Sequence, residues 1–324
     1  MSGAPVGRVA LASSMSEYLS SALGQAPCAP DAMQRALTEQ FLAPCVADLE
    51  SLFRELRAGV DPALRAARDG VPGKPYPLGL CWEISEAVRE ALDRVQAADL
   101  SAAAAKGLAA LLAFRAAGGV VRRAWGDLRG LYFQNALLVG GLYVDVSNDT
   151  VFVEKPPVEI LPFAAAGFSP IVDYAHFTRI AESYWGYRFL PNHLLPDLAP
   201  YMPLIQITPA GRIRVGPANS YMLALTLTGG FAASAQVLAA PPVPPMAFTT
   251  FGAALAGDSF VLPADAEAGR AAALAACRAY RAEGRAECAD AYNQAMAAAR
   301  EANRRFGRVI ASPSSAPPAA AAAA

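Results

Sequence analysis

The amino-acid sequence predicts an α+β fold, with an N-terminal helical group, a central antiparallel sheet built from hairpins with inserted helices, and a C-terminal Ala-rich helical arm. Apolar residues recur at helical spacing through the first third of the chain. Further along, β-branched and aromatic residues flank turn-forming clusters, as they do in antiparallel strands. Alanine, the strongest helix former, dominates the end of the chain.

These patterns divide the chain into four parts. They are a flexible segment (1–29), a main α+β domain (30–262, with a helical part over 30–126 and a sheet-containing part over 131–262), a helical arm (263–310) and a disordered Ala/Pro tail (311–324).

The helical part contains amphipathic segments separated by a loop rich in Gly and Pro. Met33, Leu37 and Phe41 share one helix face, and Pro44 is expected to start the next helix at its first turn, where its missing N–H costs no hydrogen bond. Beyond the loop "DGVPGKPYPLG", the segments "CWEISEAVREALDRVQAA" and "LSAAAAKGLAALLAFRAAGG" predict two further helices.

The sheet is expected to begin at about residue 131. The segment "NALLVGGLYVDVSNDTVFVEK" predicts two strands joined by a turn at residues 147–149, and "LIQITPAGRIRVG" predicts a second hairpin that turns at residues 209–211. A helix is expected to begin at residue 173, between the hairpins. The alternation in "YMLALTLT" predicts one more strand.

Residues 215–257 contain no charged side chain and are the only candidate for a membrane span. Arg212 and Arg214 precede them, as basic anchors precede a span. Polar residues, a Gly pair and "PPVPP" interrupt the segment, so a strand is favoured over a span. The 54% hydrophobic content reflects an Ala-rich, bacterial-like composition, and we expect a soluble protein.

Charge and cysteine content narrow the possible partners and compartments. With 27 basic and 28 acidic residues and no basic stretch, nucleic-acid binding is not expected. Five scattered cysteines suit reduced thiols in the cytoplasm, although a pairing of Cys277 with Cys288 across a bend at Gly284 stays open. The N-terminus lacks a signal-peptide core; secretion by a signal-peptide-independent route is the alternative to a cytoplasmic address.

Both histidines of the chain, His176 and His193, lie within "DYAHFTRIAESYWGYRFLPNH". On a helix, Asp173 and His176 share one face, where a carboxylate can orient an imidazole as a general base, and we expect these two residues and His193 to form the catalytic face. The other members of the predicted site are the substrate contacts Arg179, Arg188, Tyr184 and Trp185 and, if a metal is present, a ligand set drawn from His176, His193 and Asp173 or Asp197. The competing interpretation is an aromatic core that happens to contain histidine.

Cys81 is a second candidate for catalysis. In "PLGLCWEIS" it follows a loop and opens a helix, where the helix dipole favours a thiolate. The G-x-C-W run is similar to the nucleophile region of papain-like and transglutaminase-like enzymes. That resemblance implies a helix-borne nucleophile, a histidine at the start of a following strand and an acid on the neighbouring strand. Here Asp145 suits the acid, but Asn135 stands where the base is expected; Cys81 is otherwise a small apolar core residue.

The segment "VDVSNDT" allows cation binding through Asp145, Asn148 and Asp149, but turn geometry explains the same residues. Phosphate-binding loops and the common hydrolase and zinc motifs are missing from the sequence. We therefore expect a hydrolase- or transferase-like enzyme that acts on a small molecule or on an acyl or peptide group, using a His/Asp cleft around residues 173–197. The alternative is a non-catalytic, effector-like binding protein, with a protein or small molecule as partner, and with a degenerate papain-like or transglutaminase-like fold. No cofactor can be named.

Overall fold

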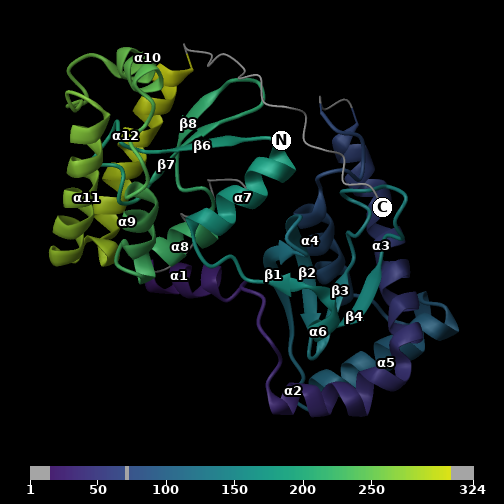
Figure 1. Cartoon of the computed structure of the whole chain (residues 1–324). Coiled ribbons are helices and arrows are strands. Elements are labelled where there is room, and N and C mark those ends of the chain that lie inside the picture. The colour runs from purple at the N-terminus through teal and green to yellow at the C-terminus, as the bar shows by residue number, and fades with distance from the viewer. Residues whose placement is uncertain (1–14, 70–72, 308–324) are drawn as a thin grey trace. The chain divides into compact units, whose positions relative to one another are not determined.

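The computed structural model of the chain describes residues 15–69 and 73–307 (Figure 1). It confirms the predicted α+β class, because helices lie at both ends of the described chain and the strands form antiparallel sheets. By their contacts the residues group into two compact units. Of the described residues, those from Gln25 to Pro170 form unit 1, and those from Met15 to Gly24 and from Ile171 to Gly307 form unit 2. The domain boundaries drawn from the sequence stay a prediction.

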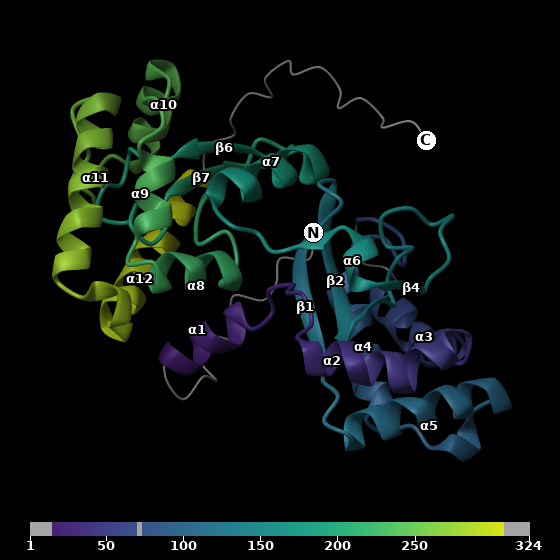
Figure 2. The same ribbon diagram turned by 60° about the horizontal axis from the view of Figure 1, so that its bottom comes forward.

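Unit 1 places helices against a five-stranded antiparallel sheet (Figure 2). The helices are α2 (Ala32–Leu37), α3 (Val46–Arg68), α4 (Cys81–Leu92), α5 (Ala102–Ala116) and the short α6 (Phe163–Ala166). The strands are β1 (Val121–Leu128), β2 (Tyr132–Val139), β3 (Leu142–Asp145), β4 (Glu159–Pro162) and β5 (Phe168–Ser169), in the spatial order β4-β3-β2-β1-β5. Helix α3 packs on α4 and α5, and α4 packs on β2.

One hydrophobic core joins these layers in unit 1. The apolar stripe of α3, with Leu49, Leu52 and Phe53, meets Ile84 and Val88 of α4 and the inward-facing residues of β2 and β3. The predicted helical spacing of these residues is confirmed. Burial of such a stripe, more than intrinsic helix propensity, stabilises helices of this length.

The predicted start of the sheet and the predicted turn of the first hairpin are wrong. The sheet begins at Val121 rather than near residue 131, and β2 pairs with β3 through a turn at Gly140 and Gly141 rather than at residues 147–149. Gly140 has a φ of 57°, a left-handed conformation that favours glycine, and a Cβ there would lie 2.4 Å from the Thr38 hydroxyl oxygen. The partner of β3 on its other side is β4, which follows an irregular loop.

Unit 2 surrounds a three-stranded antiparallel sheet with helices. The strands are β6 (Arg188–Pro191), β7 (Leu204–Ile207) and β8 (Ile213–Val215), in that order. The helices are α1 (Met15–Leu23), α7 (Tyr174–Trp185), α8 (Ser220–Thr228), α9 (Ala232–Leu238), α10 (Pro245–Leu255), α11 (Ala266–Ala282) and α12 (Ala289–Phe306). The β7–β8 hairpin and the helix beginning after residue 173 confirm two predictions.

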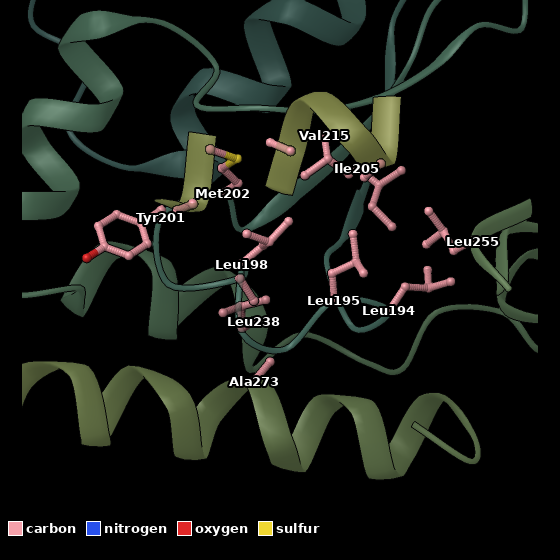
Figure 3. Packing of buried hydrophobic residues seen from close by; sticks show 14 of the residues in the cluster. Leu194, Leu195, Leu198, Tyr201, Met202, Ile205, Val215, Leu238, Leu255 and Ala273 are labelled. Atoms are coloured by element: carbon pink, nitrogen blue, oxygen red, sulfur yellow. The ribbon is translucent and has the colours of Figure 1, made fainter. Parts of the chain in front are cut away.

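The core of unit 2 gathers side chains from the sheet, from the loop after β6 and from the C-terminal helices. Figure 3 shows Leu195 and Leu198 of that loop among Ile205 of β7, Leu238 of α9 and Ala273 of α11. The predicted break at Gly284 is confirmed, since α11 ends before it and α12 begins after it. Cys277 is buried and Cys288 is exposed, and both are free thiols.

The strand predicted for "YMLALTLT" is wrong, because these residues form α8. The Asn219 side chain caps the helix by accepting a hydrogen bond from the Met222 N–H at 2.8 Å. Six of the nine side chains of α8 are buried, and they do not alternate with exposed ones as the predicted strand required.

Among the described residues, no single helix is long and apolar enough to cross a membrane. Helices α8 and α9 reach that length and composition only together, and their axes differ by 103°. The predicted flexible N-terminal segment lies partly outside the described residues, and its remainder includes α1. The predicted Ala/Pro tail lies wholly outside them.

Candidate functional site

Cys81 is the first residue of α4, as its position after the Gly- and Pro-rich loop predicts. The loop is fixed to unit 1 by the Gly79 N–H, which donates to the Thr150 carbonyl at 2.9 Å. Cys81 is partly exposed, and the next helical turn carries the buried Ser85 on the same face. The thiol therefore sits where α4 begins, against the sheet.

Asn135 of β2 is the direct neighbour of this thiol. Its side-chain amide Nδ2 lies 3.4 Å from Cys81 Sγ and donates toward the sulfur. Its backbone carbonyl accepts from Ser85 Oγ at 3.0 Å and lies 3.3 Å from Ser147 Oγ. The structure thus brings together the two residues that the resemblance to thiol enzymes pairs, with an amide in place of an imidazole.

Asp145 ends β3 and is fully buried. Its carboxylate accepts hydrogen bonds from Gln134 Nε2 at 2.6 Å, from Tyr143 Oη at 2.9 Å and from the Ser147 N–H at 2.8 Å. Burial raises the pKa of Asp145, and these three donors oppose the rise. Val144 pairs with Leu137, so Asp145, the next residue of β3, faces the opposite side of the sheet from Leu137 and from Asn135, which shares the face of Leu137.

The electrostatics around Cys81 do not favour a thiolate. Burial raises the pKa of the Cys81 thiol, and the carboxylates of Asp145 and Glu83 raise it further, while the hydrogen bond from Asn135 opposes them. A carboxamide is not basic at neutral pH and cannot remove the thiol proton. A helix N-terminus, a neighbouring base or a cation can activate a cysteine; Cys81 has the first, but Asn135 provides neither a base nor a cation.

Arg57 holds the turn that follows β3. This fully buried guanidinium binds both carboxylate oxygens of Asp149, at 2.9 and 3.1 Å, and donates to the Val146 carbonyl at 2.7 Å. Asp61 lies 2.5 Å from its Nε. Asn148 donates from its side chain to the Pro156 carbonyl at 3.0 Å. These contacts give Asp149 and Asn148 structural roles in the turn. A bound cation is not needed to explain why these residues are there.

Asp173 and His176 are joined in a way that the sequence prediction did not include. Asp173 caps α7, and its carboxylate oxygen accepts the backbone N–H of His176 at 2.7 Å. The His176 ring is half-buried, and its Nδ1 accepts from the Val172 N–H at 3.4 Å. Both groups therefore contribute to the start of the helix.

His193 lies in the loop after β6 and is fully buried, with Nε2 3.0 Å from the Leu238 carbonyl. Burial lowers the pKa of His193, and the hydrogen bond to Leu238 opposes that shift. Asp197, on the same loop, is exposed, and its carbonyl accepts from Tyr280 Oη at 3.0 Å. In the part of the chain that the structure describes, no three His, Cys, Asp or Glu side chains are grouped to hold a metal.

The predicted substrate contacts lie around the end of α7 and the start of β6. Arg179 and Arg188 are exposed, and Trp185 is 39% exposed. The Trp185 ring lies 6.0 Å from that of Phe177 and 6.2 Å from that of Tyr184, measured between centroids. The cluster therefore contains both buried and exposed side chains, and it fits a substrate site and an aromatic core equally well.

Two shallow hollows on the described surface lie away from these candidates. One, of 360 Å³, is lined by residues of the α3 end and the following loop, including Arg65, Arg68 and Tyr76. The other, of 300 Å³, lies between α10 and α12. Neither is lined by Cys81 or by a histidine. Cys81 lies in unit 1 and both histidines lie in unit 2.

Sequence reasoning missed Arg57, Gln134 and Ser147, which organise the surroundings of Asn135 and Asp145. Arg57 had a detectable signal, because it lies four residues after Phe53 and so falls on the apolar stripe of α3. A charged residue on such a stripe indicates a buried ion pair. Comparisons with protein-family models, with curated proteins and with solved structures find no match to this chain.

Proposed function

We propose that the chain is a non-catalytic binding protein, in which unit 1 keeps the helix–strand arrangement of a thiol enzyme around Cys81 but lacks its base. The observation that carries this proposal is the 3.4 Å contact between Cys81 Sγ and the Asn135 amide. An amide at that position orients the thiol without activating it. The raised pKa of Cys81 and the buried carboxylate of Asp145, turned away from Asn135, support the same conclusion.

A surface of unit 1 provides a place for a protein partner. Leu131, Phe152 and Val153 are each at least half exposed. Lys155 orders this surface, because its ammonium lies over the Phe152 ring at 5.3 Å and donates to Tyr132 Oη at 3.1 Å. Exposed apolar side chains mark an interaction site when they are grouped, and Lys155 links Phe152 to Tyr132, the neighbour of Leu131 in the chain.

The alternative proposal is an enzyme that uses His176 and His193. Its support is weaker, because the His193 ring is fully buried against a carbonyl and the Asp173 carboxylate accepts a backbone N–H. It predicts that His176→Gln abolishes an activity while the protein stays folded.

The thiol chemistry is tested by measuring the rate of alkylation of each cysteine with iodoacetamide, resolved by peptide mass spectrometry. We expect Cys81 to react more slowly than the exposed Cys288 in the same molecule at pH 7. Asn135→His should place an imidazole beside the sulfur and raise the Cys81 rate about tenfold or more, since a pKa lowered by about one unit gives ten times more thiolate. Rapid alkylation of Cys81 in the unaltered chain at pH 6 would contradict the proposal.

Binding is tested by comparing the proteins retained by the immobilised chain and by two variants. Cys81→Ala should retain the same proteins, because the proposal gives the sulfur no chemical role. Val153→Asp should lose them, while Val261→Asp, at a 91% exposed position in unit 2, is the matched control. Loss of retention in Cys81→Ala alone would favour an enzyme.

A further inference from the structure

His193 is placed at a junction of three elements in unit 2. Its backbone belongs to the loop after β6, its Nε2 contacts the carbonyl of Leu238 at the end of α9, and its own carbonyl packs against α11. A Cβ at Gly269 of α11 would lie 2.0 Å from that carbonyl oxygen, so the chain approaches α11 as closely as glycine allows. The ring therefore joins the loop to the end of α9, while the backbone of the same residue packs on α11.

The contact with Leu238 fixes the state of the ring. A carbonyl oxygen only accepts hydrogen bonds, so Nε2 carries the proton and Nδ1 carries a lone pair. Nδ1 is buried and has no hydrogen-bond partner among the described residues. Protonation at Nδ1 would create a buried N–H without an acceptor and a buried positive charge, both of which are costly.

The charged neighbours make that second proton still less favourable. Arg270 of α11 caps the next carbonyl of the same helix end, because its guanidinium donates to Ala239 at 2.9 Å. Its charge disfavours a protonated His193, whereas Glu267, also on α11, favours one. Helix α9 carries no titratable side chain. The loop that carries His193 has two other titratable side chains, Asp197 and Tyr201.

We propose that His193 is an acid-sensitive latch: the neutral ring ties the end of α9 to the loop after β6, whose backbone packs on α11, and protonation at Nδ1 favours opening of this junction because it adds a buried charge and an N–H without an acceptor. The sign follows from the lowered pKa of His193. The unfolded chain binds the proton at about pH 6.5, before the folded chain does, so the latch is intact above that pH and is lost as the pH falls below it.

The test compares unfolding in denaturant from pH 7.5 to 5 for the unaltered chain, His193→Gln and His176→Gln. A glutamine amide can still donate to Leu238 but does not titrate. Below about pH 6.5 the unfolded chain should bind one proton more than the folded chain. We therefore expect the unfolding equilibrium constants of the unaltered chain and of His176→Gln to rise up to about tenfold for each pH unit that the pH falls. His193→Gln should lack this component.

Because the chain has only two histidines, NMR of the imidazoles gives a second test that needs no variant to fold. His193 should show a proton on Nε2, none on Nδ1, and titration below about pH 6.5. A His193 ring that titrates at or above that value, or a His193→Gln chain with the pH dependence of the unaltered one, would overturn the latch.

Discussion

At the scale of single residues, the buried side chain of Arg57 stabilises the surroundings of the candidate site in unit 1. Arg57 is buried among carboxylates; burial opposes its charge, but the hydrogen bonds that it donates to Asp149 and Asp61 raise its pKa and keep it charged. It connects α3 to the turn after β3, and that turn adjoins the loop carrying Cys81 through Thr150 and Gly79. Arg57 thus supports the loop that carries Cys81 without contacting Cys81 itself.

Replacing Arg57 with Met should strongly destabilise the protein, because Asp149 would keep a part-buried charge without its partner. Breaking one side of a buried ion pair typically costs about 3–5 kcal/mol. Arg54→Met on the same helix is the matched control. Arg54 pairs with Glu50 at the surface, where such pairs contribute about 0–1 kcal/mol. Urea unfolding measures both, and equal losses would show that Arg57 does not act through its buried partners.

At the scale of elements, side chains form hydrogen bonds with backbone groups of the two edge strands of the unit 2 sheet, β6 and β8. On β8, the Asn303 amide of α12 donates to the Val215 carbonyl at 2.8 Å and accepts from the Val215 N–H at 2.8 Å. One side chain thereby satisfies both backbone groups that a further strand would pair. On β6, Glu182 accepts a hydrogen bond from the Phe189 backbone. Occupied edges of this kind prevent pairing with other chains.

We expect Asn303→Ala to lower the free energy of unfolding by about 1–3 kcal/mol, the usual cost of leaving buried polar groups without a partner. Val215 is buried, so water cannot easily replace the amide. Asn293→Ala, at an exposed position of the same helix, controls for the change in helix propensity. The measurement is chemical denaturation of both variants, with sedimentation to detect new association through β8. An Asn303→Ala chain as stable as the control would show that the edge cap is dispensable.

At the scale of the whole molecule, stability is divided between two separate hydrophobic cores. The core of unit 1 lies between α3–α5 and the sheet, and that of unit 2 lies among the β6–β8 sheet, the loop after β6 and α8–α12. Tryptophans report on each one, since Trp82 and Trp125 lie in unit 1 and Trp185 in unit 2. A local defect can therefore be followed in each unit independently.

Gly107→Ala is expected to weaken unit 1, because a Cβ there would lie 2.3 Å from the Asp48 carbonyl oxygen, where α5 crosses α3. Overpacking of this kind costs about 1–3 kcal/mol. Denaturation followed by fluorescence in a Trp185→Phe background should show a lower midpoint. The midpoint reported by Trp185, with Trp82 and Trp125 replaced by Phe, should shift less. Gly59→Ala, at an open helical position, should be neutral or stabilise by up to about 1 kcal/mol. Equal shifts from all tryptophans would show that the cores unfold together.

The sequence by itself determined the α+β class, most of the helices, the β7–β8 hairpin and the position of Cys81 at the start of α4, because these follow from local periodicity and turn chemistry. The resemblance of its G-x-C-W run to thiol enzymes also predicts that Asn135 stands where their base is expected. Only the tertiary structure decided that "YMLALTLT" is a helix, since most of its side chains are buried whether or not they fall on the alternating apolar positions. It alone revealed Asp149 as the distant partner of Arg57, the direction of Asp145 and the contact of His193 with Leu238, because each depends on residues that only folding brings together.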